Sequence, residues 1–145
     1  MALDRKFIGK TYPSFTYDVS REKIGEYARA IKSADPHHFD EAFAKQSGYG
    51  AIIAPPTFAV IFHACMIEPF FGDRELNIDM ARIMHGEQSF EFFEPVRAGD
   101  YITTSLKIHD IQNKEKADLV TIEAASKNQH GRDVCRGLYT FLHRK

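Results

Sequence analysis

The chain has 145 residues, a length typical of one compact domain, and we expect a single domain over residues 1–145. Its 19 Lys and Arg residues are balanced by 20 Asp and Glu residues, so the formal net charge is −1. Because there is no basic excess, neither nucleic acid nor an anionic membrane surface is an expected partner. The most apolar run, 51–66, contains two prolines and a histidine and is shorter than the ~20 residues of a membrane-spanning helix. We therefore expect it to form a helix of the core.

The chain contains two cysteines, Cys65 and Cys135, and both lie in apolar stretches. We interpret them as buried free thiols, although a disulfide between them stays open at this stage. The segment 1–6 has no hydrophobic signal core. Both observations favour the reducing environment of the cytoplasm.

The first elements in chain order are a strand and a helix. Residues 11–19 predict a strand, in which a proline indicates an edge position. Ser20 can cap the following helix, because its hydroxyl can accept a hydrogen bond from a backbone N–H of the first turn. Apolar residues then recur at helical spacing and predict the buried face: Ile24, Tyr27, Ala28 and Ile31.

A second, short helix is predicted after Asp40, whose carboxylate can cap it. We expect Ala42 and Phe43 on the buried side of this helix. Gly48 is placed to end it in a left-handed conformation, which glycine adopts without a steric penalty.

Pro55 and Pro56 open the next helix, at positions where a missing N–H does little harm. The residues from 58 to 66 leave this helix almost no polar face. A helix that is apolar all round is expected to be enclosed by other structure. We interpret His63, within this run, as a core histidine with satisfied hydrogen bonds.

The second half of the chain changes to the period of two that is typical of strands. Strands are predicted at 89–93, 101–110, 119–126 and 133–142, with turn residues between them. The last of these has apolar side chains on both faces, so we expect it to be covered on both sides. Together the elements predict an α+β domain in which an antiparallel sheet wraps around one buried helix.

The strongest functional signal lies in residues 35–57. A polar loop containing His38 precedes a segment that reads as fully buried, so one titratable group can stand at the mouth of an apolar tunnel. This arrangement suggests a site for a long acyl chain with a reactive head. A second polar pair, His85 and Glu87, lies two residues apart, so on a strand both side chains share one face, where we expect a structural hydrogen-bond network. The histidines have no metal-ligand spacing, and no nucleotide-binding fingerprint occurs.

Two motifs carry a family resemblance. The loop 35–40, Asp-Pro-His-His-Phe-Asp, resembles the hydratase motif D-x-N-P-x-H-x-D. The residues 85–88, His-Gly-Glu-Gln, followed by Pro-Val-Arg-Ala-Gly-Asp at 95–100, resemble an H-G-E-Q…P…A-G-D segment. The chain thus resembles the MaoC-like (R)-specific enoyl-thioester hydratases and 3-hydroxyacyl dehydratases, which have the hot-dog fold. Within them it is most similar to the N-terminal domains of FAS1-type dehydratases and to the acyl-channel subunits of heterodimeric ones.

The resemblance implies a reaction and a set of partners. Water is added to a 2-enoyl thioester, or removed from a (3R)-hydroxyacyl thioester, carried on CoA or on acyl carrier protein. No cofactor beyond this thioester carrier is expected. Because hot-dog sheets pair edge to edge, the resemblance also implies a homodimer or a heterodimer with another hot-dog subunit.

The resemblance also assigns roles to residues. It places the catalytic histidine at His38, and it places the catalytic aspartate at Ser33, which cannot act as a base. Asp35, two residues later, is the candidate substitute. The glycine whose N–H forms the oxyanion hole falls on Pro55, which has no N–H. The residues expected to bind substrate are Ser33, Tyr49, Gly50, Pro55, Thr57, Phe58, His85 and Glu87.

Three hypotheses follow for the function. The first is an active hydratase or dehydratase that uses His38, with Asp35 as its partner. The second is a non-catalytic subunit that binds the acyl chain while another hot-dog subunit supplies the catalytic groups, because the pattern Ala54-Pro55-x-Thr57-Phe58 resembles such subunits. The third is a thioesterase of the same fold, for which no distinctive motif is present.

Overall fold

The computed structural model describes residues 2–145. Its strands are β1 (Thr11–Asp18), β2 (Ile83–Phe92), β3 (Tyr101–Asn113), β4 (Ala117–Lys127) and β5 (Asp133–Arg144). Its α-helices are α1 (Arg21–Ala30), α2 (Glu41–Gln46), α3 (Ala59–His63) and α4 (Ile67–Phe71), with short 3-10 helices at Arg5–Phe7, Pro36–His38, Pro56–Phe58, Ala64–Met66 and Met80–Arg82. We call the continuous helical segment 56–71 the central helix.

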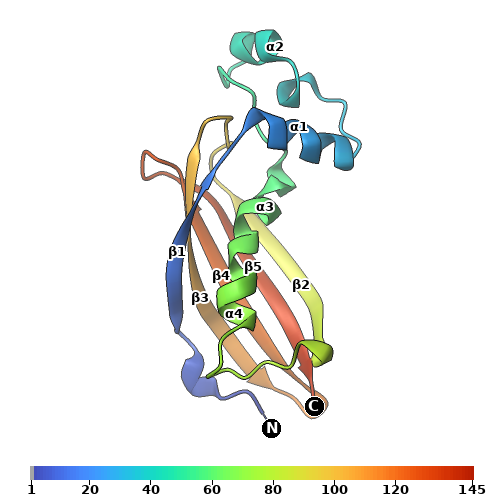
Figure 1. The fold of residues 1–145 in the computed structure, drawn as a ribbon, viewed down its shortest axis with the longest axis vertical. Coiled ribbons are helices and arrows are strands. Elements are labelled where there is room, and N and C mark those ends of the chain that lie inside the picture. The colour runs from blue at the N-terminus through green and yellow to red at the C-terminus, as the bar shows by residue number, and fades with distance from the viewer. Residues whose placement is uncertain (1) are drawn as a thin grey trace.

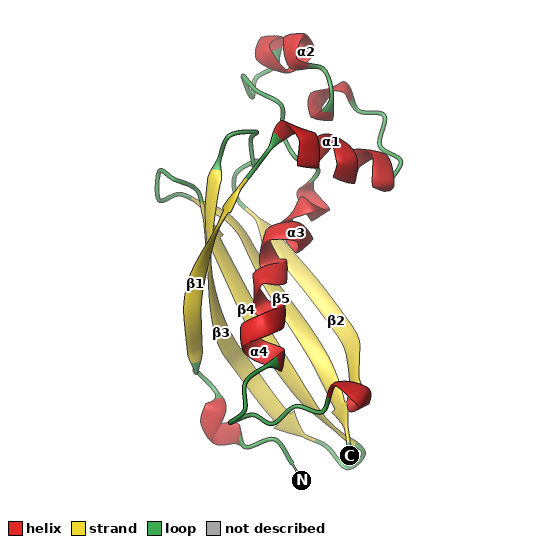
Figure 2. Cartoon of the chain, viewed as in Figure 1, coloured by secondary structure: helices red, strands yellow, loops and turns green. Residues whose placement is uncertain are grey.

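The five strands form one antiparallel sheet in the order β1-β3-β4-β5-β2. Figure 1 shows the central helix, with α3 and α4, crossing one face of this sheet, while α1 and α2 lie beyond its end. Figure 2 shows that the sheet is a single curved layer. The predicted α+β architecture, an antiparallel sheet curved around one helix, is therefore confirmed.

The two predicted helix caps are present. The Ser20 hydroxyl accepts a hydrogen bond from the Lys23 N–H at 3.0 Å, and the Asp40 carboxylate accepts one from the Phe43 N–H at 3.0 Å. These bonds satisfy backbone donors that the first turn of a helix leaves without partners. On α1 the residues Ile24 and Ala28 are buried as predicted and Tyr27 is half-buried. Ile31, however, lies at the end of the helix and is exposed.

The prediction for the short helix α2 is wrong in two details. Ala42 and Phe43 are exposed, and Ala44 is the buried residue of α2. The Phe43 ring instead packs edge-on against the His37 ring, with the centroids 4.9 Å apart. The positive φ that ends this region belongs to Gly50, at 73°, and not to Gly48, because the helix ends at Gln46, with Ser47 as its C-cap, and a turn separates it from the left-handed residue.

The central helix begins at the proline pair as predicted and packs one side onto the sheet. Its sheet-facing residues are all buried: Phe58, Phe62, His63, Met66 and Phe70. The prediction that other structure encloses this helix all round is wrong for the single chain. Ala64 is exposed, and Ile67 keeps 57% of its accessible surface, because the sheet covers one side of the helix and nothing in residues 2–145 covers the other.

The predicted strands of the second half are confirmed, and each extends further than the sequence pattern indicates. β5 lies between β4 and β2. Its sheet face under the helix is buried at Cys135, Tyr139 and Phe141. The opposite face is only partly covered at Leu138 and Leu142, so the expectation of full cover on both sides is wrong. Within residues 2–145, no second layer packs on that face of the sheet.

A β-bulge in β2 changes the predicted relation of His85 and Glu87. His85 pairs with Phe141 and Glu87 pairs with Thr140, so the register shifts between them. An extra residue in one strand reverses the facing of every later side chain. His85 therefore points to the helix side and Glu87 to the outer face, and the prediction that they share one face and one hydrogen-bond network is wrong.

Both cysteines have free thiols, which settles the open question of a disulfide. Cys135 is buried as expected, whereas Cys65 is only half-buried. Within residues 2–145, no helix has both the length and the apolar character needed to cross a membrane.

Candidate functional site

His38 lies between the sheet and the helices α1 and α2 beyond its end. It ends the 3-10 turn Pro36–His38, which begins where the Asp35 carboxylate accepts a hydrogen bond from the His37 N–H at 3.0 Å. The His38 side chain is nearly enclosed, and the whole residue keeps 7% of its accessible surface. Its Nδ1 lies 2.6 Å from the carbonyl oxygen of Ile53. Because a carbonyl only accepts, Nδ1 carries the proton, and Nε2 is left as the basic nitrogen of the neutral ring.

Asp35 supplies a negative charge beside that nitrogen. Its Oδ2 lies 3.9 Å from His38 Nε2. Its Oδ1 accepts from the backbone N–H of His37 and lies 2.7 Å from the His37 ring nitrogen. The backbone hydrogen bond from His37, followed by the bond from its ring, lowers the pKa of the Asp35 carboxyl. Asp35 is therefore an ionised carboxylate at neutral pH.

An apolar cavity of about 370 Å³ opens beside His38 and Asp35. The start of the central helix forms one wall, with Pro55, Phe58 and Phe62 among its lining residues. The end of β2 and the start of β5 contribute further apolar lining residues: Phe92, Phe93, Val134 and Cys135. A mostly apolar cavity with a few polar groups at one side is the common form of a small-molecule site.

Half of the residues predicted for the site line this cavity. His38, Asp35, Tyr49, Pro55 and Phe58 do so. The others lie outside it: Ser33, Gly50, Thr57, His85 and Glu87.

Local contacts show where several of these outlying residues are placed. The Ser33 hydroxyl accepts a long bond of 3.3 Å from the Asp35 N–H, and the Thr57 hydroxyl bonds to the Tyr27 phenol at 2.9 Å on the surface. His85 lines a second cavity beside the central helix, and Glu87 lies on the outer face of the sheet. The bulge in β2 separates this last pair from each other. His85 is separated from His38 because it pairs with Phe141, toward the opposite end of β2 from Phe92, which lines the cavity of His38.

Sequence reasoning missed the contribution of the segment after β2. Phe92, Phe93 and Glu94 line the cavity, and the Phe93 N–H is bonded to the Val134 carbonyl at 3.0 Å, which fixes this segment next to β5. Their signal in the sequence is weak, because a run of two phenylalanines is equally typical of a core or an interface. The Ile53 carbonyl that orients His38 has no sequence signal, since every residue has a carbonyl.

A buried polar cluster lies further along the central helix. His63 Nδ1 bonds to the Tyr139 phenol at 2.7 Å, and its Nε2 bonds to the Ser126 hydroxyl at 2.9 Å. Ser126 in turn bonds to Thr104 at 2.7 Å. His63 is fully buried, and this burial lowers its pKa to about 4. The interpretation of His63 as a satisfied core histidine is confirmed. No group of three His, Cys, Asp or Glu residues suited to a metal ion occurs within residues 2–145.

Comparisons with known proteins agree with this architecture. Residues 6–136 match the family model described as the FAS1-like dehydratase domain region. A "UPF0336 protein" of Saccharopolyspora erythraea is 39% identical over 145 residues, which are 99% of this chain and 93% of the relative. In the crystal structure of the C-terminally truncated HadBC (3R-hydroxyacyl-ACP dehydratase) complex from Mycobacterium tuberculosis, one chain is 32% identical with a TM-score of 0.82, covering 94% of this chain and 96% of that one. A MaoC-like dehydratase, 28% identical, has a TM-score of 0.86, covering 96% of this chain and 42% of that one.

Proposed function

Since the chain belongs to the family of FAS1-like dehydratase domain regions and has the hot-dog fold of MaoC-like dehydratases, we propose that it interconverts 2-enoyl and (3R)-hydroxyacyl thioesters. The acyl chain occupies the apolar cavity, and the thioester is carried on CoA or acyl carrier protein. The observation that carries this proposal is that His38 lines that cavity with its Nδ1 bonded to the Ile53 carbonyl, which leaves Nε2 to act as the base.

In the proposed reaction His38 acts as the base in the hydration direction. A water oxygen attacks C3 of the enoyl thioester while Nε2 takes one of the water protons, so the charge moves to the thioester oxygen as an enolate. The imidazolium then returns the proton to C2, which completes the addition of one water molecule. The bond from Nδ1 to the Ile53 carbonyl keeps the ring in the tautomer that this step requires. Dehydration follows the same path in reverse.

Asp35 supports this chemistry as a charge and not as the base. Its low pKa makes it a weak proton acceptor, whereas its carboxylate at 3.9 Å stabilises the positive charge that develops on His38. Ser33, where the resemblance places an aspartate, lies outside the cavity lining, so Asp35 is the carboxylate beside His38.

The start of the central helix favours a second candidate function. Pro55 and Pro56 have no N–H, so the first backbone donor of this helix belongs to Thr57. An enolate oxygen beside Pro55 therefore lacks the donor that normally stabilises it. This feature supports a subunit that binds the acyl chain for a catalytic hot-dog partner.

A partner subunit is expected at the β2 edge of the sheet. β2 pairs with β5 on one side only, so its other edge presents unpaired backbone groups. Met84 on this strand keeps 51% of its accessible surface, and Phe92 and Phe93, which also line the cavity, are exposed as well. The other edge strand, β1, contains Pro13 and a register shift between Tyr12 and Phe15, which makes it a poorer pairing edge. We therefore propose a dimer through β2, in which the second subunit covers the exposed wall of the cavity.

Hydration of crotonyl-CoA by the purified protein tests this function. The loss of the enoyl absorbance measures the rate of the reaction. We expect turnover by the unmodified chain and a loss of about 10²-fold or more in kcat for His38→Ala. The matched control is His109→Ala, since His109 is exposed on the outer face of the sheet, paired with Glu123 at 3.6 Å.

The same assay separates the alternatives. A chain that is inert alone but binds butyryl-CoA, and becomes active with a MaoC-like partner, supports the acyl-binding subunit. Release of free thiol from the thioester indicates a thioesterase. Absence of both turnover and thioester binding contradicts the proposed function.

A further inference from the structure

His38 borders a second recess besides the apolar cavity. This recess, of about 560 Å³, lies along α1 and is lined by Arg21, Glu22, Gly25, Arg29, His38 and Phe39. The apolar cavity and the α1 recess share His38. His38 thus lies between a cavity with mostly apolar lining residues and a recess whose lining includes two guanidinium groups.

The charges of the α1 recess leave one cation available. Arg21 Nη1 is 2.9 Å from Glu41 Oε2, so its charge is already balanced. Glu22 adds one carboxylate to the lining. Arg29 is different, since no carboxylate of residues 2–145 lies within 4.0 Å of its guanidinium. A guanidinium of this kind is suited to an anion with two or three oxygens in one plane, such as a phosphate.

Gly25 shapes the floor of this recess. A Cβ at Gly25 would lie 3.3 Å from Arg29 Nη1 and 3.9 Å from the Phe39 ring, so the guanidinium lies directly over the backbone of the helix. A helix rises ~1.5 Å per residue, so Gly25, over which the Arg29 guanidinium lies, is roughly 6 Å along the axis from Arg21. The two guanidinium groups thus both line the recess along the first half of α1.

We propose that the α1 recess binds the 4′-phosphopantetheine arm of the thioester carrier, with Arg29 contacting its phosphate. This inference rests on the proposed function. When the acyl chain lies in the apolar cavity and the thioester lies at His38, the arm leaves past the same imidazole, and the recess that shares His38 is a direct route. The phosphate is the one charged group of that arm, and both CoA and acyl carrier protein present it.

Binding measurements with saturated thioesters test the assignment without requiring turnover. Butyryl-pantetheine, butyryl-4′-phosphopantetheine and butyryl-CoA are titrated calorimetrically into the full chain. We expect the phosphate to strengthen binding about tenfold over butyryl-pantetheine, and this preference to weaken with added salt. Arg29→Gln should remove the preference and leave the affinity for butyryl-pantetheine unchanged. Glutamine retains the helix propensity of arginine, so α1 should persist, which circular dichroism checks.

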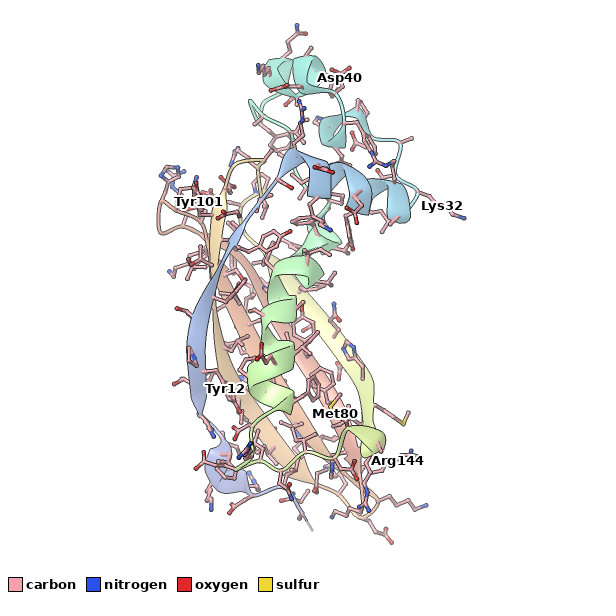
Figure 3. The ribbon with its side chains drawn as sticks, in the orientation of Figure 1. Tyr12, Lys32, Asp40, Met80, Tyr101 and Arg144 are labelled. Carbon is pink, nitrogen blue, oxygen red and sulfur yellow. The ribbon has the colours of Figure 1, made fainter. Side chains whose placement is uncertain are left out.

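The control variant is Lys116→Gln, which also removes one positive charge but at the opposite end of the molecule. The Lys116 carbonyl accepts a bond from the N–H of Lys145. Lys145 follows Arg144 in the chain, and Figure 3 labels Arg144 at the opposite end of the molecule from Lys32, which lies just after α1. This variant should keep the phosphate preference. Titration of a butyryl carrier protein beside butyryl-CoA identifies the source of the phosphate, since the natural carrier is the one that the unmodified chain binds more tightly.

Two results would overturn the inference. A chain that binds butyryl-pantetheine and butyryl-4′-phosphopantetheine equally, or a preference that persists in Arg29→Gln, contradicts the role of Arg29 while the proposed function stands. A chain that binds none of the thioesters contradicts both.

Discussion

The imidazole of His63 and the phenol of Tyr139 are hydrogen bonded at 2.7 Å in the interior, between the central helix and β5. Both rings are nearly or fully buried, and Ser126 completes the bonding of the imidazole from β4. Three elements far apart in the sequence are thus joined through one neutral histidine. Since a buried polar group without a partner costs free energy, this arrangement fixes the helix on the sheet in one position.

His63 should make the stability of the fold depend on pH. Burial lowers its pKa from 6.5 to about 4 in the folded chain, whereas the unfolded chain keeps the ordinary value. Between these two pKa values the unfolded chain binds a proton at His63 and the folded chain does not. The free energy of unfolding therefore keeps the whole contribution of His63 above pH 6.5 and decreases as the pH falls toward 4. The loss is on the order of 3 kcal/mol in the free energy of unfolding.

Urea denaturation at a series of pH values measures this loss. The free energy of unfolding is plotted against pH for the unmodified chain and for His63→Gln. In His63→Gln the part of this pH dependence that is due to His63 should vanish, while the part due to exposed histidines remains. An identical pH profile in both chains would show that His63 is not the group responsible.

Gly137 should be intolerant of a side chain, because it lies under the same pair of rings. A Cβ there would be 2.8 Å from Tyr139 Cε2 and 2.9 Å from His63 Nδ1. Neither ring can move without breaking buried hydrogen bonds, so Gly137→Ala should lower the free energy of unfolding by about 1–3 kcal/mol. Gly48→Ala is the matched control, since nothing lies within 4 Å of its Cβ position, and it should change stability by less than ~0.5 kcal/mol. Equal stability of the two variants would refute the argument.

A lysine on the β2 edge should weaken dimerisation. Met84 keeps 51% of its accessible surface on β2, and Phe15 keeps 50% on the opposite edge strand β1. Burying an unpaired ammonium group in an interface is costly, so Met84→Lys should weaken a β2 dimer about tenfold or more, while Phe15→Lys should not. Sedimentation of the three chains over a range of concentrations measures the dissociation constants. If only Phe15→Lys dissociates the dimer, the interface is at β1.

The two thiols should differ in reactivity. Burial raises the pKa of Cys135 to about 12, and it also raises the pKa of the half-buried Cys65. Because the thiolate is the reactive form and must also meet the reagent, iodoacetamide at mildly alkaline pH should modify Cys65 slowly and Cys135 only after unfolding. Mass spectrometry of peptides from native and denatured chains reads out each site. Rapid modification of Cys135 in the native chain would contradict its burial at the cavity wall.

The local features of this protein follow from its amino-acid sequence alone. Ser20 and Asp40 begin helices because their short side chains bond to backbone N–H groups only a few residues away. The alternation of apolar residues in the second half likewise defines strands, since the period of a strand is a property of its own backbone. These local rules were sufficient for the α+β architecture and for placing His38 and Asp35 in one loop.

The surroundings of those residues depend instead on contacts between distant segments of the chain. The orientation of His38 depends on the carbonyl of Ile53, and the separation of His85 from Glu87 depends on a bulge whose register is set by β5. The α1 recess arises because Arg29 of one helix and His38 of a later turn come together in space. Such contacts depend on how distant segments pack. Because many residues share the free energy of that packing, no short pattern in the sequence predicts an individual contact.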